Sequence, residues 1–190
     1  MIADGRRLAY NLNILALVCM QAPLYGALMV QLTGDLPCPL CLLERLGMFA
    51  VIIGLVMNVR LGIRPAHYGF SIAGAMTGMA IAGRHVLLHI NDPPGGGYGG
   101  SVLGLHLYTW ALIVFLCFLA GSAVLLMIPD GIDESGDDVN PRARWSGSRP
   151  ARVVCYMAVL ICVVNAVLAL MECGLGQCPD NPTGYWIFGN

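Results

Sequence analysis

Residues 102–128 read VLGLHLYTWALIVFLCFLAGSAVLLMI and contain no aspartate, glutamate, lysine or arginine. A helix needs about 20 apolar residues to cross the hydrocarbon core of a bilayer, which is about 30 Å thick. Because a backbone in lipid must satisfy its own hydrogen bonds, such a stretch predicts a transmembrane helix. Four further apolar stretches have spanning length: Leu12–Leu32, Leu42–Val59, Tyr68–Ile90 and Val153–Met171. The sequence therefore predicts an all-α, polytopic membrane helix bundle with five spans.

The composition of the whole chain points to the same class. Of its 190 residues, 57% are hydrophobic and only 11% are charged, whereas soluble domains have about 45–50% and about 25%. The mean hydropathy is +0.73. Since so few charged side chains cannot cover a soluble fold of this size, the composition argues against a secreted domain, a nucleic-acid-binding protein and a disordered chain.

The basic residues indicate how the spans are oriented. All ten are arginines, and eight of them would lie on one side of the membrane: Arg6, Arg7, Arg60, Arg64, Arg142, Arg144, Arg149 and Arg152. The loops that would face the other side, 33–41, 91–101 and 172–190, contain none. Because arginine favours cytoplasmic loops, we expect a cytoplasmic N-terminus and a C-terminus on the outer side. We expect the first span to be retained, because it is too long for a signal-peptide core.

The apolar spans and the charged residues divide the chain into three parts. Residues 1–128 hold four spans and form the predicted core. Residues 129–152, first acidic and then rich in arginine, are expected to form a cytoplasmic linker. Residues 153–190 hold the fifth span and a cysteine-containing tail on the outer side.

The eight cysteines fall into two groups. Four lie within predicted spans, where a free cysteine packs like a small apolar residue; they are Cys19, Cys117, Cys155 and Cys162. The other four lie on the predicted outer face, with Cys38 and Cys41 before the second span and Cys173 and Cys178 after the fifth. Disulfides persist on the outer face of a membrane. The four outer cysteines are therefore candidates for disulfide chemistry.

The segment Cys38-Pro39-Leu40-Cys41 is a C-x-x-C at a helix start. Proline suits the first helical turn, which places Cys41 near the amino end of the second span. There the helix dipole and Arg45, four residues on, would stabilise a Cys41 thiolate. Glu44 would pair with Arg45 or relay a proton. Ionisable residues within a span are costly to bury and indicate function.

Two other classes of function remain open. A metal-handling membrane protein would use the four outer cysteines as one thiolate site for zinc or copper. A non-catalytic subunit would use both pairs only as structural staples. The C-x4-C spacing of Cys173 and Cys178 suits a short disulfide loop, and a zinc site would leave Arg45 unexplained, so redox chemistry is favoured.

The stretch CPLCLLER, residues 38–45, resembles the central motif of the DsbB family of disulfide bond formation proteins: C-x-x-C followed by x-x-E-R. Gly83-Arg84, and Leu103-Gly104-Leu105 with Trp110, are also similar, so the resemblance covers about residues 12–128. It implies a four-helix bundle in the bacterial inner membrane that binds a quinone, ubiquinone or menaquinone. Such a protein reoxidises a periplasmic thioredoxin-like thiol oxidase of the DsbA type and passes the electrons to the membrane quinone pool.

By motif position, the resemblance implies that Cys38 and Cys41 form the redox pair next to the quinone. Cys41 would contact the quinone, Arg45 would polarise it, and Glu44 would belong to the same binding set.

The third span offers further candidates for this pocket. Arg84 and His89 lie near its outer end. For His89, as for His85 and His106, an interfacial polar residue is an equally open interpretation.

One departure from the family concerns its second cysteine pair. The family carries this pair in the loop between spans three and four, but residues 91–101 contain no cysteine. We expect the fifth span to supply Cys173 and Cys178 in its place, so that electrons pass from the partner to this pair, then to Cys38 and Cys41, then to quinone. A reductase of the vitamin K epoxide reductase type is an alternative within the redox class.

Overall fold

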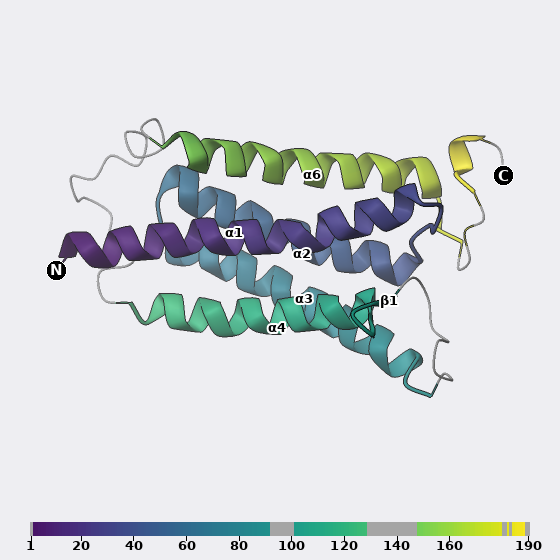
Figure 1. Ribbon diagram of the computed structural model, residues 1–190, viewed down its shortest axis with the longest axis horizontal. Coiled ribbons are helices and arrows are strands. Elements are labelled where there is room, and N and C mark those ends of the chain that lie inside the picture. The colour runs from purple at the N-terminus through teal and green to yellow at the C-terminus, as the bar shows by residue number, and fades with distance from the viewer. Residues whose placement is uncertain (1, 92–100, 129–147, 180–181, 183, 189–190) are drawn as a thin grey trace.

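The computed structural model describes residues 2–91, 101–128, 148–179, 182 and 184–188. It contains five long helices that lie side by side (Figure 1): α1 (Ile2–Leu32), α2 (Pro39–Leu61), α3 (Pro65–Leu88), α4 (Leu107–Leu126) and α6 (Arg149–Cys173). Two short strands, β1 (Ser101–Val102) and β2 (Leu105–His106), pair antiparallel before α4. A 3-10 turn, η1 (Trp186–Phe188), lies near the C-terminus.

Helices α1, α2, α4 and α6 are each long and apolar enough to cross a membrane. Helix α3 has similar length but is less apolar, because it carries His67, Arg84 and His85 as well as several glycines. It packs against α2 and α4 and runs along the bundle with them (Figure 1). The prediction of an all-α membrane bundle is confirmed.

The observed helix bounds differ from the predicted spans at several ends; α1, for example, begins at Ile2 rather than at Leu12. The fourth span begins at Leu107 rather than Val102, because Leu103 and Gly104 adopt positive φ angles of 53° and 79° and turn the chain into the β1–β2 hairpin. Trp110 Nε1 donates to the Val102 carbonyl at 2.9 Å and holds the hairpin on α4. Of the predicted linker 129–152, residues 129–147 lie outside the described residues, and 149–152 belong to α6.

Glycines bring α2, α3 and α4 into close contact. A Cβ on Gly47 of α2 would lie only 2.7 Å from the Cα of Gly78 on α3, and a Cβ on Gly78 would clash with the ring of Phe115 on α4. Small residues at such positions let transmembrane helices approach closely. This contact fixes how α3 faces α2.

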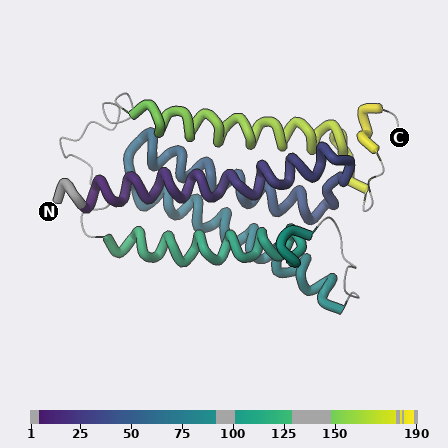
Figure 2. Tube along the Cα trace, in the orientation of Figure 1, coloured from purple at the N-terminus to yellow at the C-terminus, as the bar shows by residue number. Residues whose placement is uncertain are grey.

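Cys38 and Cys41, at the start of α2, and Cys173 and Cys178, at the end of α6, lie at one end of the bundle. The N-terminus lies at the opposite end, whereas the α1–α2 connection, the end of α3, the β1–β2 hairpin and the end of α6 lie together (Figure 2). The start of α2 is thereby brought close to the tail that follows α6.

Candidate functional site

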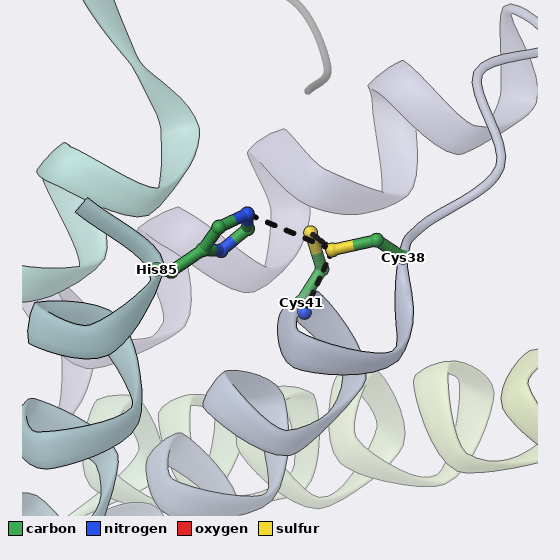
Figure 3. Close-up of side chains that lie close together, drawn as sticks. All are labelled: Cys38, Cys41 and His85. Atoms are coloured by element: carbon green, nitrogen blue, oxygen red, sulfur yellow. Dashed lines mark hydrogen bonds between the residues drawn. The ribbon is translucent and has the colours of Figure 1, made fainter. Parts of the chain in front are cut away.

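The C-x-x-C pair sits on the first turn of α2. Cys38 is the N-cap, with φ −71° and ψ 164°, and Pro39 follows it in the first turn. The Cys41 backbone N–H donates to Cys38 Sγ at 3.2 Å, and the two Sγ atoms lie 2.6 Å apart (Figure 3). Cys38 is buried and Cys41 half-buried. The pair is therefore positioned to form a disulfide by a small movement.

The structure assigns the stabilised thiolate to Cys38 rather than to Cys41. Hydrogen bonding from the Cys41 side chain lowers the pKa of Cys38 to about 5, and His85 and the Cys41 backbone N–H act in the same direction, while burial opposes them. The sequence pattern places the thiolate on Cys41; the geometry favours Cys38, because the free Cys41 N–H of the helix start donates to the sulfur of the N-cap residue.

His85 and Glu44 extend the site from Cys38 across to α3. His85 Nε2 lies 3.8 Å from Cys38 Sγ, and His85 Nδ1 lies 2.9 Å from Glu44 Oε1. Both side chains are buried. The three residues thus form a chain of thiol, imidazole and carboxylate, in which the carboxylate orients the ring.

This chain changes two sequence-based interpretations. Glu44 pairs with His85 and not with Arg45. His85, rather than His89, faces the thiol; the ring of His89 lies 5.3 Å from that of His85 and 5.6 Å from that of Tyr108. Arg84 is exposed, and neither Arg84 nor His89 lines the cavity described below.

Arg45 is buried in a network of amides that the sequence analysis missed. Its Nη1 donates to Gln31 Oε1 of α1 at 2.7 Å and to Asn165 Oδ1 of α6 at 3.1 Å. Gln31 Nε2 in turn lies 3.4 Å from Glu172 Oε2. The available signal was the occurrence of Asn165 within the apolar fifth span, because such a residue is rarely placed in lipid without a role; Glu172 follows directly after that span.

A cavity of about 410 Å³ lies beside Cys41, which is within the usual size of a ligand pocket. Its walls are largely apolar and come from α1, the α1–α2 connection, α2, the β1–β2 hairpin and α4. Helix α2 contributes Cys41, Glu44, Arg45 and Met48, which share one helix face. The cavity therefore joins a redox-capable cysteine and a cation to an apolar space within the bundle.

The second outer pair forms a disulfide, Cys173–Cys178, directly after Glu172. Gly174 ends α6 with φ 62°, and a Cβ there would meet the ring of Trp186 at 2.8 Å, so η1 packs on this turn. Since both sulfurs are bonded to each other, the four outer cysteines do not form one thiolate cluster in this structure.

Another group could hold a metal ion. Among the residues that the structure describes, Cys38, Cys41 and His85 place their ligand atoms within 4.8 Å of one another. Two sulfurs and an imidazole suit soft or borderline metals. The two sulfurs can equally form a dithiol–disulfide couple. The geometry is therefore compatible with metal binding and with redox chemistry, and the similarity to known proteins distinguishes the two.

Comparison with known proteins resolves the class. Residues 9–96 match the family described as disulfide bond formation protein DsbB. Disulfide bond formation protein B 1 of Pseudomonas savastanoi pv. phaseolicola is 32% identical over 145 residues, which cover 58% of this chain and 85% of the relative. Disulfide bond formation protein B of Pseudomonas syringae pv. tomato is 31% identical over 139 residues, with 55% and 81% covered. No solved structure gives a significant match.

These similarities include the C-x-x-C at the start of α2 and most of the described bundle before α4. Helix α6, with Asn165 and the Cys173–Cys178 disulfide, lies beyond the matched family region. On this evidence the chain belongs to the DsbB family of disulfide bond formation proteins, a family of membrane thiol oxidoreductases.

Proposed function

We propose that this protein oxidises the dithiol of a periplasmic thioredoxin-like thiol oxidase of the DsbA type and passes the electrons to a membrane quinone. The observation that carries the proposal is the position of Cys41, which is paired with Cys38 and lines an apolar cavity inside a membrane bundle. The arginine distribution supports a cytoplasmic N-terminus and periplasmic cysteines, and the bacterial relatives support a location in the inner membrane.

The cavity suits a quinone in size and chemistry. A quinone ring is flat and largely apolar, with two carbonyl oxygens that need hydrogen-bond donors. The cavity walls are largely apolar, and Arg45 provides N–H donors on its α2 side. When bound, the quinone supplies the two-electron acceptor that thiol chemistry lacks.

The residues of the chain prepare and hold the dithiol. Cys38, as the low-pKa thiol, carries the negative charge at the helix start. His85 takes up the thiol proton at Nε2, and Glu44 holds the ring through Nδ1. When the dithiol of Cys38 and Cys41 becomes a disulfide, two electrons and two protons leave, and the acceptor takes up both. Cys41 faces the cavity and so lies closest to that acceptor.

We further propose that Cys173–Cys178 is the shuttle disulfide that the partner reduces first. A partner dithiol reduces this disulfide by exchange through a mixed disulfide, and the resulting thiols then reduce Cys38–Cys41 in the same way. Two observations support this order. The disulfide lies at the same end of the bundle as Cys38 (Figure 1), and the preceding Glu172 lies within hydrogen-bond distance of Gln31.

The decisive experiment measures quinone reduction in detergent, driven by a reduced DsbA-type oxidase. The wild type is compared with Cys173→Ser combined with Cys178→Ser, and Cys117→Ser, an exposed cysteine on α4, serves as the control. The wild type and the control should turn over. The double variant should lose turnover with the oxidase but retain it with dithiothreitol.

The other outcomes are equally informative. Equal turnover of the wild type and the double variant would make Cys173–Cys178 structural. No turnover by the wild type, together with stoichiometric zinc or copper bound to the reduced protein, would replace the proposed function by metal binding at Cys38, Cys41 and His85.

A further inference from the structure

Arg45 is held by neutral groups, although it lies inside a membrane bundle. Only 7% of the residue is exposed, and both acceptors of Nη1 are amide oxygens, from Gln31 and Asn165. A carboxylate in direct contact would pair with the guanidinium and offset its charge. Amide oxygens instead fix its orientation and leave the positive charge available to the cavity that Arg45 lines.

Both amides are themselves fixed so that their oxygens point to Arg45. Asn165 Nδ2 donates to the Ile161 carbonyl at 2.9 Å, within α6. Gln31 Nε2 lies 3.4 Å from Glu172 Oε2 and 3.4 Å from the Tyr185 hydroxyl. Because each NH₂ group has its own acceptor, the oxygen of each side chain is left to receive the Arg45 N–H. The carboxylate of Glu172 therefore helps to hold Gln31, and it also attracts the Arg45 guanidinium through space.

Helix α6 is the element that adds this arrangement to the matched family region. The family match ends at residue 96, whereas α6 begins at Arg149. Its buried face consists of Ala151, Cys155, Ala158, Ile161, Asn165 and Glu172. Four small or apolar residues along this face pack the helix onto the bundle. The two polar residues, Asn165 and Glu172, lie in the C-terminal part of α6, beside Arg45.

We infer that α6 serves as a positioning element for the acceptor site, in which Asn165, together with Gln31, holds the Arg45 guanidinium toward the cavity. The hydrogen bonds of Arg45 to Gln31 and Asn165 both use Nη1. The N–H groups on Nη2 and Nε can therefore donate to a ligand carbonyl. The inference rests on the proposed function, because it assigns Asn165 and Gln31 as positioning residues for quinone binding. Neither residue lines the cavity itself.

The test compares quinone binding and turnover of Asn165→Leu with the wild type. Leucine is branched at the same carbon but has no hydrogen-bond acceptor. Binding of a short-chain ubiquinone is measured without turnover through quenching of tryptophan fluorescence, since Trp110 lines the cavity. The variant loses a hydrogen bond to a charged group. We therefore expect its Kd for quinone to be about 10-fold weaker and its quinone KM to rise by a similar factor. The kcat at saturating quinone and the rate of exchange with the thiol oxidase should stay near the wild-type values.

Val167→Leu, at an exposed position on the same helix, is the matched control and should bind quinone as the wild type does. Gln31→Leu removes the other acceptor from α1 and should show the same selective rise in KM; it decides the question if Asn165→Leu does not fold. Wild-type quinone affinity in both folded leucine variants, or a fall in kcat with unchanged Kd, would overturn the inference. A wild type that neither binds nor reduces quinone would overturn the proposed function instead.

Discussion

Replacing His85 by phenylalanine tests whether Cys38 is the thiolate of the redox pair and His85 its partner. The pKa of Cys38 is about 5, first because of hydrogen bonding from the Cys41 side chain and then because of the His85 ring, against the effect of burial. An ordinary thiol has a pKa of about 8.5. Since phenylalanine removes both a hydrogen bond and a positive charge, we expect the pKa of Cys38 to rise to about 6–7.

The assay is the pH dependence of Cys38 alkylation in the reduced protein, with the modified residue identified by mass spectrometry. Alkylation follows the thiolate. At pH 6, a thiol with a pKa of about 5 is mostly ionised, whereas one with a pKa of about 6–7 is about one-half to one-tenth ionised. Because a thiolate of higher pKa is intrinsically more nucleophilic, the readout is the midpoint of the pH profile, which should shift from about pH 5 to about pH 6–7. His89→Phe, one turn later on α3, is the control. A midpoint that stays near pH 5 in His85→Phe would refute the assignment of His85.

The same change should make the Cys38–Cys41 disulfide a weaker oxidant. A lowered thiol pKa stabilises the reduced form. This stabilisation is complete above pH about 8.5, declines as the pH falls toward about 5, and is absent below that. Near pH 7, each unit by which the pKa of Cys38 rises costs about 1.4 kcal/mol, or about 30 mV for a two-electron couple. Equilibration with glutathione at pH 7 should therefore show a potential about 30–60 mV more negative; an unchanged potential would contradict the argument.

Two further predictions concern the role of Arg45 in quinone binding and the role of Gly78 in helix packing. Arg45→Gln should raise the quinone KM about 10-fold or more, while Arg84→Gln, on an exposed side chain, should leave it unchanged; steady-state kinetics with varied quinone will show whether the two differ. Gly78→Ala should lower stability by about 1–3 kcal/mol because its Cβ meets Phe115, whereas Gly69→Ala has open space; thermal unfolding in detergent compares them, and equal midpoints would contradict the packing.

The spans and the first cysteine pair could be predicted because each depends on local sequence. A lipid-embedded backbone allows few alternatives, so an apolar stretch of sufficient length identifies a helix. Likewise, a cysteine followed by proline places the N-cap of a helix. The hairpin at 101–106 was missed because Val102, Leu103 and Leu105 are apolar and extend the fourth span, and only Gly104 indicates a turn.

The partners within the site could not be predicted, because they depend on how the helices are rotated against one another. The sequence alone does not distinguish His85 from His89, one turn apart; the Gly47–Gly78 contact sets the rotation of α3 that points His85 to Glu44. Asn165 stands far from Arg45 in sequence, and only the packing of α6 brings them within 3.1 Å. Helix packing is a tertiary property with no local signal.

A second cluster of buried polar residues lies between α1, α2 and α3 and differs in composition from the cluster around Cys38. Asn13 Nδ2 lies 2.6 Å from the Tyr68 hydroxyl, Asn58 Nδ2 donates to Asn13 Oδ1 at 3.1 Å, and His67 Nδ1 lies 3.1 Å from Asn58 Oδ1. These bonds tie α1, α2 and α3 together. None of the four side chains lines the cavity, and the cluster contains no carboxylate, guanidinium or thiol. Polar residues of this kind satisfy one another and join helices.

The cluster around Cys38 differs in that it retains groups that are expensive to bury. Glu44, Arg45, His85 and Glu172 are all buried, and Glu44 and Arg45 also reach the cavity. A bundle that needed only to hold its helices together would be served by side chains such as those of the other polar cluster, without the cost of carboxylates and a guanidinium in lipid. The cost is understandable if two electrons and two protons must leave Cys38 and Cys41 at this place, because moving them requires groups that can change or oppose charge. The placement of α6, which orients Arg45 through the amide of Asn165, follows the same requirement.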